Sequence, residues 1–184
     1  MTNSISFNPF PNLSTERLIL RKLDLSDSEA VFAIRVDVES RKYVDVDVPK
    51  TVEDAEKFIK KINGGISRDA WIYWAITLKN SKELIGTVCL WNFSEDQFTA
   101  EIGYELNANF RGKGYMTETV KRVLDFAFES MNLKKIEAYV YSENRSSIKI
   151  LERFGFEFEK IFEETHSSGF KYEMAVYSCH VIKK

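Results

Sequence analysis

A glycine-containing loop between an expected strand and an expected helix constrains this chain more than any other feature. The strand covers about 98–106 and leads through Arg111, Gly112, Lys113 and Gly114 into an amphipathic helix. Glycine lets a backbone turn tightly and lets a ligand approach the amides closely. The first turn of a helix has unpaired N–H groups and a dipole that favours an anion. The loop therefore has the composition of a diphosphate-binding site, and a solvated turn is the alternative interpretation.

Two common phosphate-binding motifs fit this loop poorly. The G-x-x-x-x-G-K-[ST] string of nucleotide triphosphatases is absent. The G-x-G-x-x-G fingerprint of dinucleotide-binding proteins needs a glycine where Thr117 stands, and five residues separate Leu106 from Gly112. Glu143, at the end of the next strand, could act as the ribose-binding acid of such a protein. A nicotinamide-dependent oxidoreductase therefore stays open as a weak alternative.

The rest of the sequence predicts a mixed α+β protein built around one sheet. Hydrophobic periodicity and turn residues predict the order β-α-α-β-β-β-α-β-α-β-β. The expected strands cover about 16–23, 71–78, 83–93, 98–106, 134–141, 156–165 and 170–179, and the expected helices cover about 25–36, 51–65, 116–128 and 146–154. We expect Ser26 to cap the first helix in a capping box with Glu29. We expect Thr51 to open the second helix, and Gly64 and Gly65 to close it.

Length and charge limit the classes of protein that the chain can represent. Its 184 residues predict one domain over 1–184, with an N-terminal extension over 1–14 and a core over about 15–179. The formal net charge of -2 disfavours a protein whose main role is to bind nucleic acid directly. Oligomeric state is open between a monomer and a homodimer.

Cysteine, histidine and hydropathy patterns exclude further classes. Cys89 and Cys179 are too few for a disulfide framework, and His166 and His180 add no metal-ligand spacing, so we expect no metal. The N-terminal residues do not resemble a secretory signal. The longest apolar run, near 71–76, is far shorter than the ~20 residues of a membrane span. We therefore expect a cytoplasmic protein with reduced thiols and no membrane contact.

Four segments in the right order resemble one family of proteins. They are TERLILR at 15–21, AEIGY at 100–104, RGKGYMTE at 111–118 and NRSSIKILERFGF at 144–156. Arg111, Gly114 and Met116 approximate an R/Q-x-x-G-x-G/A signature, with methionine where the signature has glycine or alanine. The chain thereby resembles the GNAT acetyltransferases, and within them the branch of ribosomal-protein alanine and serine N-acetyltransferases.

The resemblance implies a fold and a pair of substrates. The GNAT fold has a central mixed, largely antiparallel sheet that splays between its fourth and fifth strands, with helices on both faces. The donor is acetyl-CoA, whose pantetheine arm lies in the splay, and the acceptor is a primary amine that attacks directly in a ternary complex. A ribosomal-protein N-terminus, another peptide amine, a polyamine and a small antibiotic-like amine all stay open as acceptors. The resemblance assigns coenzyme binding to Leu106, Arg111, Gly112, Lys113, Gly114, Tyr115, Met116, Thr117 and Asn144. For Asn144 a helix cap is the alternative.

The reaction needs a base and a group that helps the sulfur to leave. An α-amine titrates near ~8 and a lysine near ~10.4, so a base must remove a proton from the ammonium form. The family often uses a glutamate that Glu101 matches, and strand alternation places Glu105 on the same face as a second candidate. A solvated pair of acids is the alternative. Many relatives carry a tyrosine as general acid where this chain has Leu151. We assign catalytic assistance to Ser147, with close packing as its alternative. Ser146, Tyr141 or water could take the same task, or the thiolate could leave unassisted. A non-catalytic acyl-CoA sensor stays open as another function.

Two further groups of residues allow two interpretations each. Trp71, Tyr73, Trp74 and Trp91 are expected mainly in the core, with one or two lining the acceptor channel. The acids Asp37, Glu39, Asp45 and Asp47 either form a solvated run or attract a cationic amine.

Overall fold

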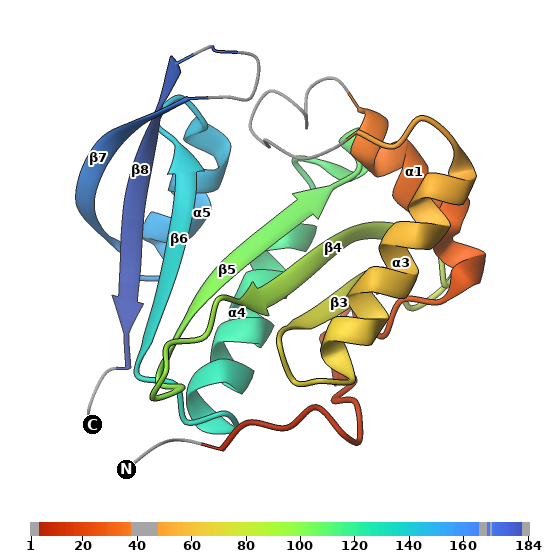
Figure 1. The fold of residues 1–184 in the computed structure, drawn as a ribbon, viewed down its shortest axis with the longest axis horizontal. Coiled ribbons are helices and arrows are strands. Elements are labelled where there is room, and N and C mark those ends of the chain that lie inside the picture. Colours follow the sequence, from red (N-terminus) through yellow and green to blue (C-terminus); the bar gives the residue numbers. More distant parts are fainter. Residues whose placement is uncertain (1–3, 38–47, 166–168, 170, 182–184) are drawn as a thin grey trace.

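A computed structural model describes residues 4–37, 48–165, 169 and 171–181 (Figure 1). The strands are β1 (Leu13–Ser14), β2 (Leu18–Arg21), β3 (Ile72–Leu78), β4 (Leu84–Trp91), β5 (Thr99–Leu106), β6 (Lys135–Tyr141), β7 (Glu157–Thr165) and β8 (Lys171–His180). The helices are α1 (Ser28–Val36), α3 (Val52–Ile66), α4 (Tyr115–Glu129) and α5 (Arg145–Arg153), with short 3-10 helices η1 (Leu25–Asp27) and η2 (Ala108–Phe110). The expected order of helices and strands is confirmed, and β1 is an additional short strand.

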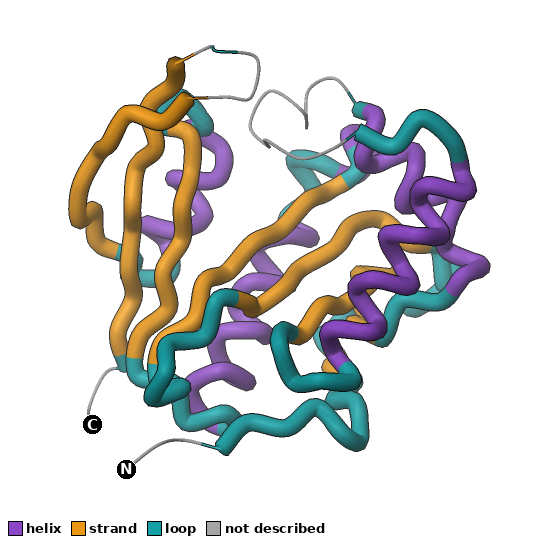
Figure 2. The backbone as a smooth tube through the Cα atoms, in the orientation of Figure 1, coloured by secondary structure: helices purple, strands orange, loops and turns teal. Residues whose placement is uncertain are grey.

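The strands form one sheet that opens between β5 and β6. Its order is β1-β2-β3-β4-β5-β6-β8-β7, and each neighbouring pair is antiparallel except β5 and β6, which are parallel. The β5–β6 register begins at Thr99 and Lys135 and ends at Glu101 and Glu137. Beyond that pair the two strands diverge, as Figures 1 and 2 show. Because β5 and β6 are the fourth and fifth of the expected strands, the expected splay is confirmed.

Helices cover both faces of the sheet, as expected. Neighbouring residues of β3 show this, because side chains of a strand alternate between faces. The ring of Tyr73 lies 5.8 Å from that of Phe58 on α3, and the ring of Trp74 lies 5.9 Å from that of Phe126 on α4. The hydrophobic core lies between the sheet and these two layers, and Trp74 is fully buried in it.

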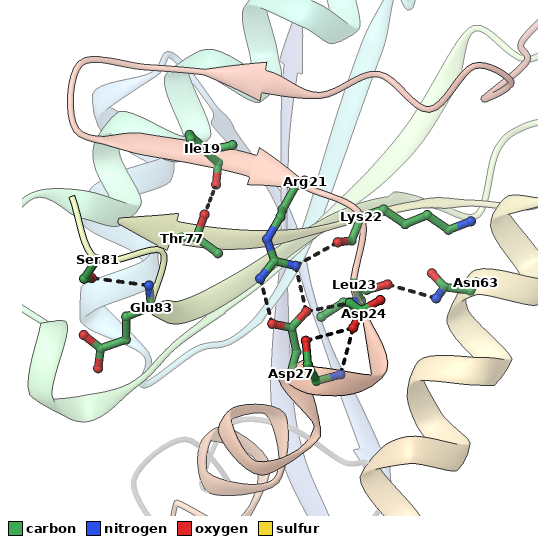
Figure 3. A network of polar contacts seen from close by, with 11 residues as sticks. Ile19, Arg21, Lys22, Leu23, Asp24, Asp27, Asn63, Thr77, Ser81 and Glu83 are labelled. Atoms are coloured by element: carbon green, nitrogen blue, oxygen red, sulfur yellow. Dashed lines mark hydrogen bonds and ion pairs between the residues drawn. The ribbon is translucent and has the colours of Figure 1, made fainter. Parts of the chain in front are cut away.

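The first helical segment begins at Leu25, as expected, but has a different cap (Figure 3). Asp24, not Ser26, caps η1, and its carboxylate accepts the Ser26 N–H at 2.9 Å. Asp27 completes the capping box by accepting the Asp24 N–H at 2.8 Å. Two Arg21 nitrogens bind the two carboxylate oxygens of Asp27, each at 2.7 Å. The expected Ser26–Glu29 box is therefore wrong, because the ion pair of Asp27 with Arg21 on β2 favours a box two residues earlier in the chain.

The second helix also ends differently from the prediction. Thr51 caps α3 as expected, by accepting the Asp54 N–H at 3.3 Å. Gly64 and Gly65, however, lie inside the helix. A Cβ atom on Gly65 would lie 2.0 Å from the Trp71 ring, so glycine is required here for close packing rather than for a helix end.

Candidate active site

The start of α4 forms a site with the geometry of an anion cradle. Gly112 and Gly114 adopt φ values of 74° and 80°, which are left-handed and favour glycine. Gly114 is the N-cap of α4 and provides no side-chain cap, and the first helical bond runs from the Glu118 N–H to the Gly114 carbonyl at 3.0 Å. The N–H groups of Tyr115, Met116 and Thr117 precede that bond and have no helical carbonyl to meet. These residues fit the expected site for the coenzyme pyrophosphate.

Arg17 on the β1–β2 connection holds this loop in place. Its Nη1 donates to the Lys113 carbonyl at 3.0 Å, and its Nε pairs with Glu118 Oε2 at 2.7 Å. The guanidinium also lies 4.5 Å from the centre of the Tyr115 ring. Thr15 donates a further hydrogen bond to Glu118. The TERLILR segment alone indicates no role for Arg17, because its partners lie about a hundred residues away in the chain.

The cationic side chains of the loop contact other groups of the protein. Arg111 Nε donates to the Leu106 carbonyl at 3.3 Å, and Nη2 pairs with Asp37 Oδ2 at 2.8 Å. Lys113 Nζ lies 5.3 Å from the centre of the Phe110 ring. Asp37 is thus part of an ion pair, and the other acids of the predicted run, Glu39, Asp45 and Asp47, lie outside the described residues. For an anion at this site, backbone amides and the helix dipole would supply attraction independently of the Arg111 side chain.

The end of β5 presents backbone groups to the splay. Leu106 is the register partner of Gly86, and the Asn107 N–H donates to the Ile85 carbonyl at 2.9 Å. This pattern makes Leu106–Gly86 a non-hydrogen-bonded pair, so the Leu106 peptide groups point away from β4. They face the gap where β5 and β6 part, which is the position expected for contacts with the pantetheine arm.

Two carboxylates project from one face of the same strand, the buried Glu101 near its start and the half-buried Glu105 near its end. Glu101 is 9% exposed, and its Oε1 accepts a hydrogen bond from Asn92 Nδ2. Burial raises the pKa of Glu101, although the Asn92 hydrogen bond opposes the rise, and nearby Glu137 adds to it. Burial also raises the pKa of Glu105, against the effect of Arg35 on α1. The alternative of two solvated acids is therefore wrong, because burial favours the protonated form of each group more than water does.

The tryptophans divide between the core and an exposed position. Trp74 is fully buried, and Trp71 donates its indole N–H to the Ile62 carbonyl at 3.0 Å. Trp91 is 47% exposed and is the register partner of Glu101. A Cβ atom on Gly103 would lie 4.0 Å from its Nε1, so the indole lies on the same sheet face as the two carboxylates. Trp91 is thus the tryptophan that borders the candidate base.

The start of α5 lies beside the splay. Asn144 caps this helix, because its Oδ1 accepts the Ser147 N–H at 3.1 Å and the Ser146 hydroxyl at 2.8 Å. The Tyr104 hydroxyl donates to the Ser147 carbonyl at 3.5 Å, which links β5 to α5. Leu151 is fully buried in the core. The position at which many relatives carry a tyrosine therefore serves packing here.

The described residues contain no group of three or more His, Cys, Asp or Glu side chains suited to hold a metal ion. Among the same residues, no helix is both long and apolar enough to cross a membrane. Cys89 and Cys179 are free thiols, and burial raises the pKa of Cys89 to about 12, so Cys89 is protonated and inert as a nucleophile. A parallel strand pair that parts beside an uncapped helix start matches the coenzyme cleft of an acyl-CoA-dependent transferase.

Comparison with known proteins identifies the family. The sequence profile of the acetyltransferase (GNAT) domain matches residues 17–157. The chain is 31% identical over 170 residues to the uncharacterized N-acetyltransferase YoaA of Bacillus subtilis, covering 92% of this chain and 96% of YoaA. The chain therefore belongs to the GNAT acetyltransferase family. It is an acyltransferase that uses acetyl-CoA as its donor, and this assignment decides against a nicotinamide-dependent oxidoreductase.

Solved structures agree with the fold. A GNAT-family acetyltransferase from Bacillus anthracis superposes with a TM-score of 0.82 at 27% identity, covering 92% of this chain and 98% of that one. RimL, a ribosomal L7/L12 α-N-protein acetyltransferase in complex with coenzyme A, has a TM-score of 0.82 at 17% identity, covering 93% and 98% of the two chains. The second comparison supports the fold alone.

Proposed function

We propose that this protein acetylates a primary amine by direct attack in a ternary complex, with Glu101 as the general base. One observation carries the proposal. Glu101 and Glu137 form the last register pair before β5 and β6 part, so a buried carboxylate of raised pKa lies where the splay begins. The uncapped start of α4, which follows β5, supplies the site for the pyrophosphate at the other end of the arm.

The chemistry follows from these positions. Glu101 takes a proton from the ammonium form of the acceptor, and the neutral nitrogen attacks the thioester carbonyl. The new C–N bond forms, the C–S bond breaks, and the coenzyme thiolate leaves and takes up the proton that the attacking nitrogen loses. Backbone N–H groups on the open edge of β5 are placed to stabilise the oxyanion. Asn144 and Ser147 lie at the α5 side of the splay, where the Ser147 hydroxyl assists the departing sulfur by hydrogen bonding.

For the acceptor we propose the α-amino group of a peptide, such as the N-terminus of a ribosomal protein. An α-amine titrates near ~8, so a glutamate of raised pKa suffices as its base, whereas a lysine near ~10.4 is harder to deprotonate. The exposed indole of Trp91 next to Glu101 offers a surface for the first side chain of such a peptide. RimL, a structural neighbour, is named for this kind of acceptor.

Further parts of the proposal concern the whole chain. We take residues 1–184 as one catalytic domain that acts in the cytoplasm as a monomer or a homodimer, without direct contact with nucleic acid or a membrane. The free thiols are consistent with a reducing compartment.

A thiol-release assay with acetyl-CoA tests the acceptor class. The panel contains peptides with free N-termini, the same peptides with blocked N-termini and one internal lysine, spermidine, and an aminoglycoside. We expect release with the free N-termini and little with the blocked peptides, and mass spectrometry should place the acetyl group on the α-nitrogen. Faster turnover of spermidine or of the lysine peptides would contradict the peptide α-amine as acceptor while leaving the transferase activity in place.

A further inference from the structure

The connection from β4 to β5 places an asparagine beside the candidate base. Trp91 ends β4 as the register partner of Glu101, and Asn92 follows with a φ of 49°. Left-handed backbone is uncommon in residues other than glycine, and asparagine is among those that adopt it most readily. This turn brings the Asn92 side chain to the carboxylate, where Nδ2 donates to Glu101 Oε1.

The residues around Asn92 fix its position. The Phe93 ring packs 6.0 Å from the ring of Phe7. Ser94 closes the loop, because its N–H donates to the Thr99 carbonyl and its Oγ accepts the Thr99 N–H, both at 3.0 Å. The amide of Asn92 is therefore held between the end of β4 and a tightly bonded turn.

We infer that Asn92 is a positioning residue for acetyl transfer, which holds one carboxylate oxygen of Glu101 and leaves the other to receive the proton of the acceptor. This inference rests on the proposed role of Glu101 as the base. An ionised carboxylate accepts hydrogen bonds only, so the amide nitrogen is the group of Asn92 that can hold it. Fixing one oxygen restricts the rotation of the carboxylate and keeps the other in a reactive orientation.

The electrostatic surroundings of Glu101 predict the direction in which its pKa moves when the Asn92 amide is removed. The titratable groups around it are Cys89 on β4, Glu105 on β5, and Glu137 and Tyr139 on β6, with Lys135 paired to Glu137 at 2.7 Å and Arg35 on α1 acting on Glu105. Burial raises the pKa of Glu101, Glu137 adds to the rise, and the Asn92 hydrogen bond lowers it. Removal of the Asn92 amide therefore raises the pKa further. Because the base works in its ionised form, the acid limb of the pH–rate profile then moves to higher pH.

The variant Asn92→Gly tests the inference, because glycine keeps the left-handed backbone and removes only the amide. We expect kcat/KM at neutral pH to fall about tenfold, the worth of a hydrogen bond to a charged group. The acid limb should shift upward, and the KM for acetyl-CoA should not change. Asn92→Asp should lose more, because it replaces the donor with a like charge. Asn132, in the α4–β6 connection, also has a left-handed φ of 55°, so Asn132→Gly is a matched control that should retain full activity.

A double-mutant cycle with Glu101→Gln separates positioning from a general structural effect. If Asn92 acts through the carboxylate, Asn92→Gly should cause no further loss in the Glu101→Gln background. An impaired Glu101→Gln enzyme to which Asn92→Gly adds its full tenfold loss would overturn the positioning role alone. An unshifted acid limb in Asn92→Gly would do the same. A fully active Glu101→Gln enzyme would overturn both the base and the positioning residue.

Discussion

The surroundings of three glutamates shift their pKa values in opposite directions and so separate candidate proton acceptors from a structural anchor. Burial is the largest influence on Glu101, Glu105 and Glu118, and alone it would raise the pKa of each. Hydrogen bonds from Thr15 and Arg17 outweigh burial at Glu118 and lower its pKa. At Glu101 and Glu105 the opposing contacts are too weak to do so. Glu118 is therefore an anchor for the α4 loop that stays ionised to lower pH than an ordinary glutamate, whereas burial shifts the two β5 carboxylates toward the protonated form.

The anchor role of Glu118 predicts a pH-dependent stability difference. Glu118→Gln should lower the free energy of unfolding by about 1 kcal/mol at neutral pH, because the ion pair with Arg17 is lost. A carboxyl whose folded pKa is depressed stabilises the protein above its unfolded pKa of about 4.3. That contribution disappears as pH falls through the lower folded pKa, so wild type and variant should converge there.

Urea unfolding at several pH values measures this difference. Glu56→Gln is the control, because Glu56 makes an exposed contact with Lys60 at 3.8 Å whose loss should change little. A Glu118→Gln difference that stays constant down to pH 3 would show that Glu118 acts through packing instead of charge.

At the scale of elements, the start of α4 combines a backbone requirement with a binding role. Gly112 has a φ of 74° and open space around the position of a Cβ atom. Gly155, after α5, has the same φ and the same open space. The two glycines thus have the same conformational need, and only Gly112 belongs to the loop for which we propose pyrophosphate binding.

Because Gly112 and Gly155 have the same backbone conformation, substitution of either should affect stability equally, but coenzyme binding should depend on Gly112 alone. Gly112→Ala and Gly155→Ala should each cost about 1–2 kcal/mol of stability, because alanine is strained at positive φ. Only Gly112→Ala should weaken acetyl-CoA binding, by displacing amides that contact the anion. Calorimetric titration of both variants measures this, and equal affinities in the two would remove the loop from the binding site.

The elements themselves were predictable from the sequence, and the contacts between distant elements were not. Periodicity placed α4 and β5 to within a few residues, because each buries a regular apolar face. The cap of η1 was mispredicted because Asp24 and Ser26 are both good caps, and the choice depends on Arg21 in another element. Arg17 and Asn92 were missed because their roles depend on partners that only the folded chain brings near.

At the scale of the whole molecule, the sheet has one weak junction. The two parts on either side of the splay share three register pairs of β5 and β6, between Thr99–Glu101 and Lys135–Glu137. The contact of Tyr104 with Ser147 adds one link across the same gap. A coenzyme bound in the splay would contact both parts, so binding should stabilise the fold as a whole.

Thermal unfolding tests this coupling. Acetyl-CoA at a hundred times its Kd should stabilise the native state by about 2.7 kcal/mol, which for a chain of this length raises Tm by roughly 5–11 °C. NAD should leave Tm unchanged. An equal shift with NAD, or none with acetyl-CoA, would contradict the assignment of the splay as the coenzyme site.

The most direct test of the central claim is the pH dependence of acetyl transfer by Glu101→Gln with an accepted amine. The account predicts a kcat lowered about 10²–10⁴-fold at neutral pH, with unchanged affinity for acetyl-CoA, because the carboxylate lies on the acceptor side. The loss should shrink as pH rises toward the pKa of the amine, where the neutral form no longer needs a base. A Glu101→Gln enzyme with full activity at neutral pH would contradict the assignment of Glu101 as the base.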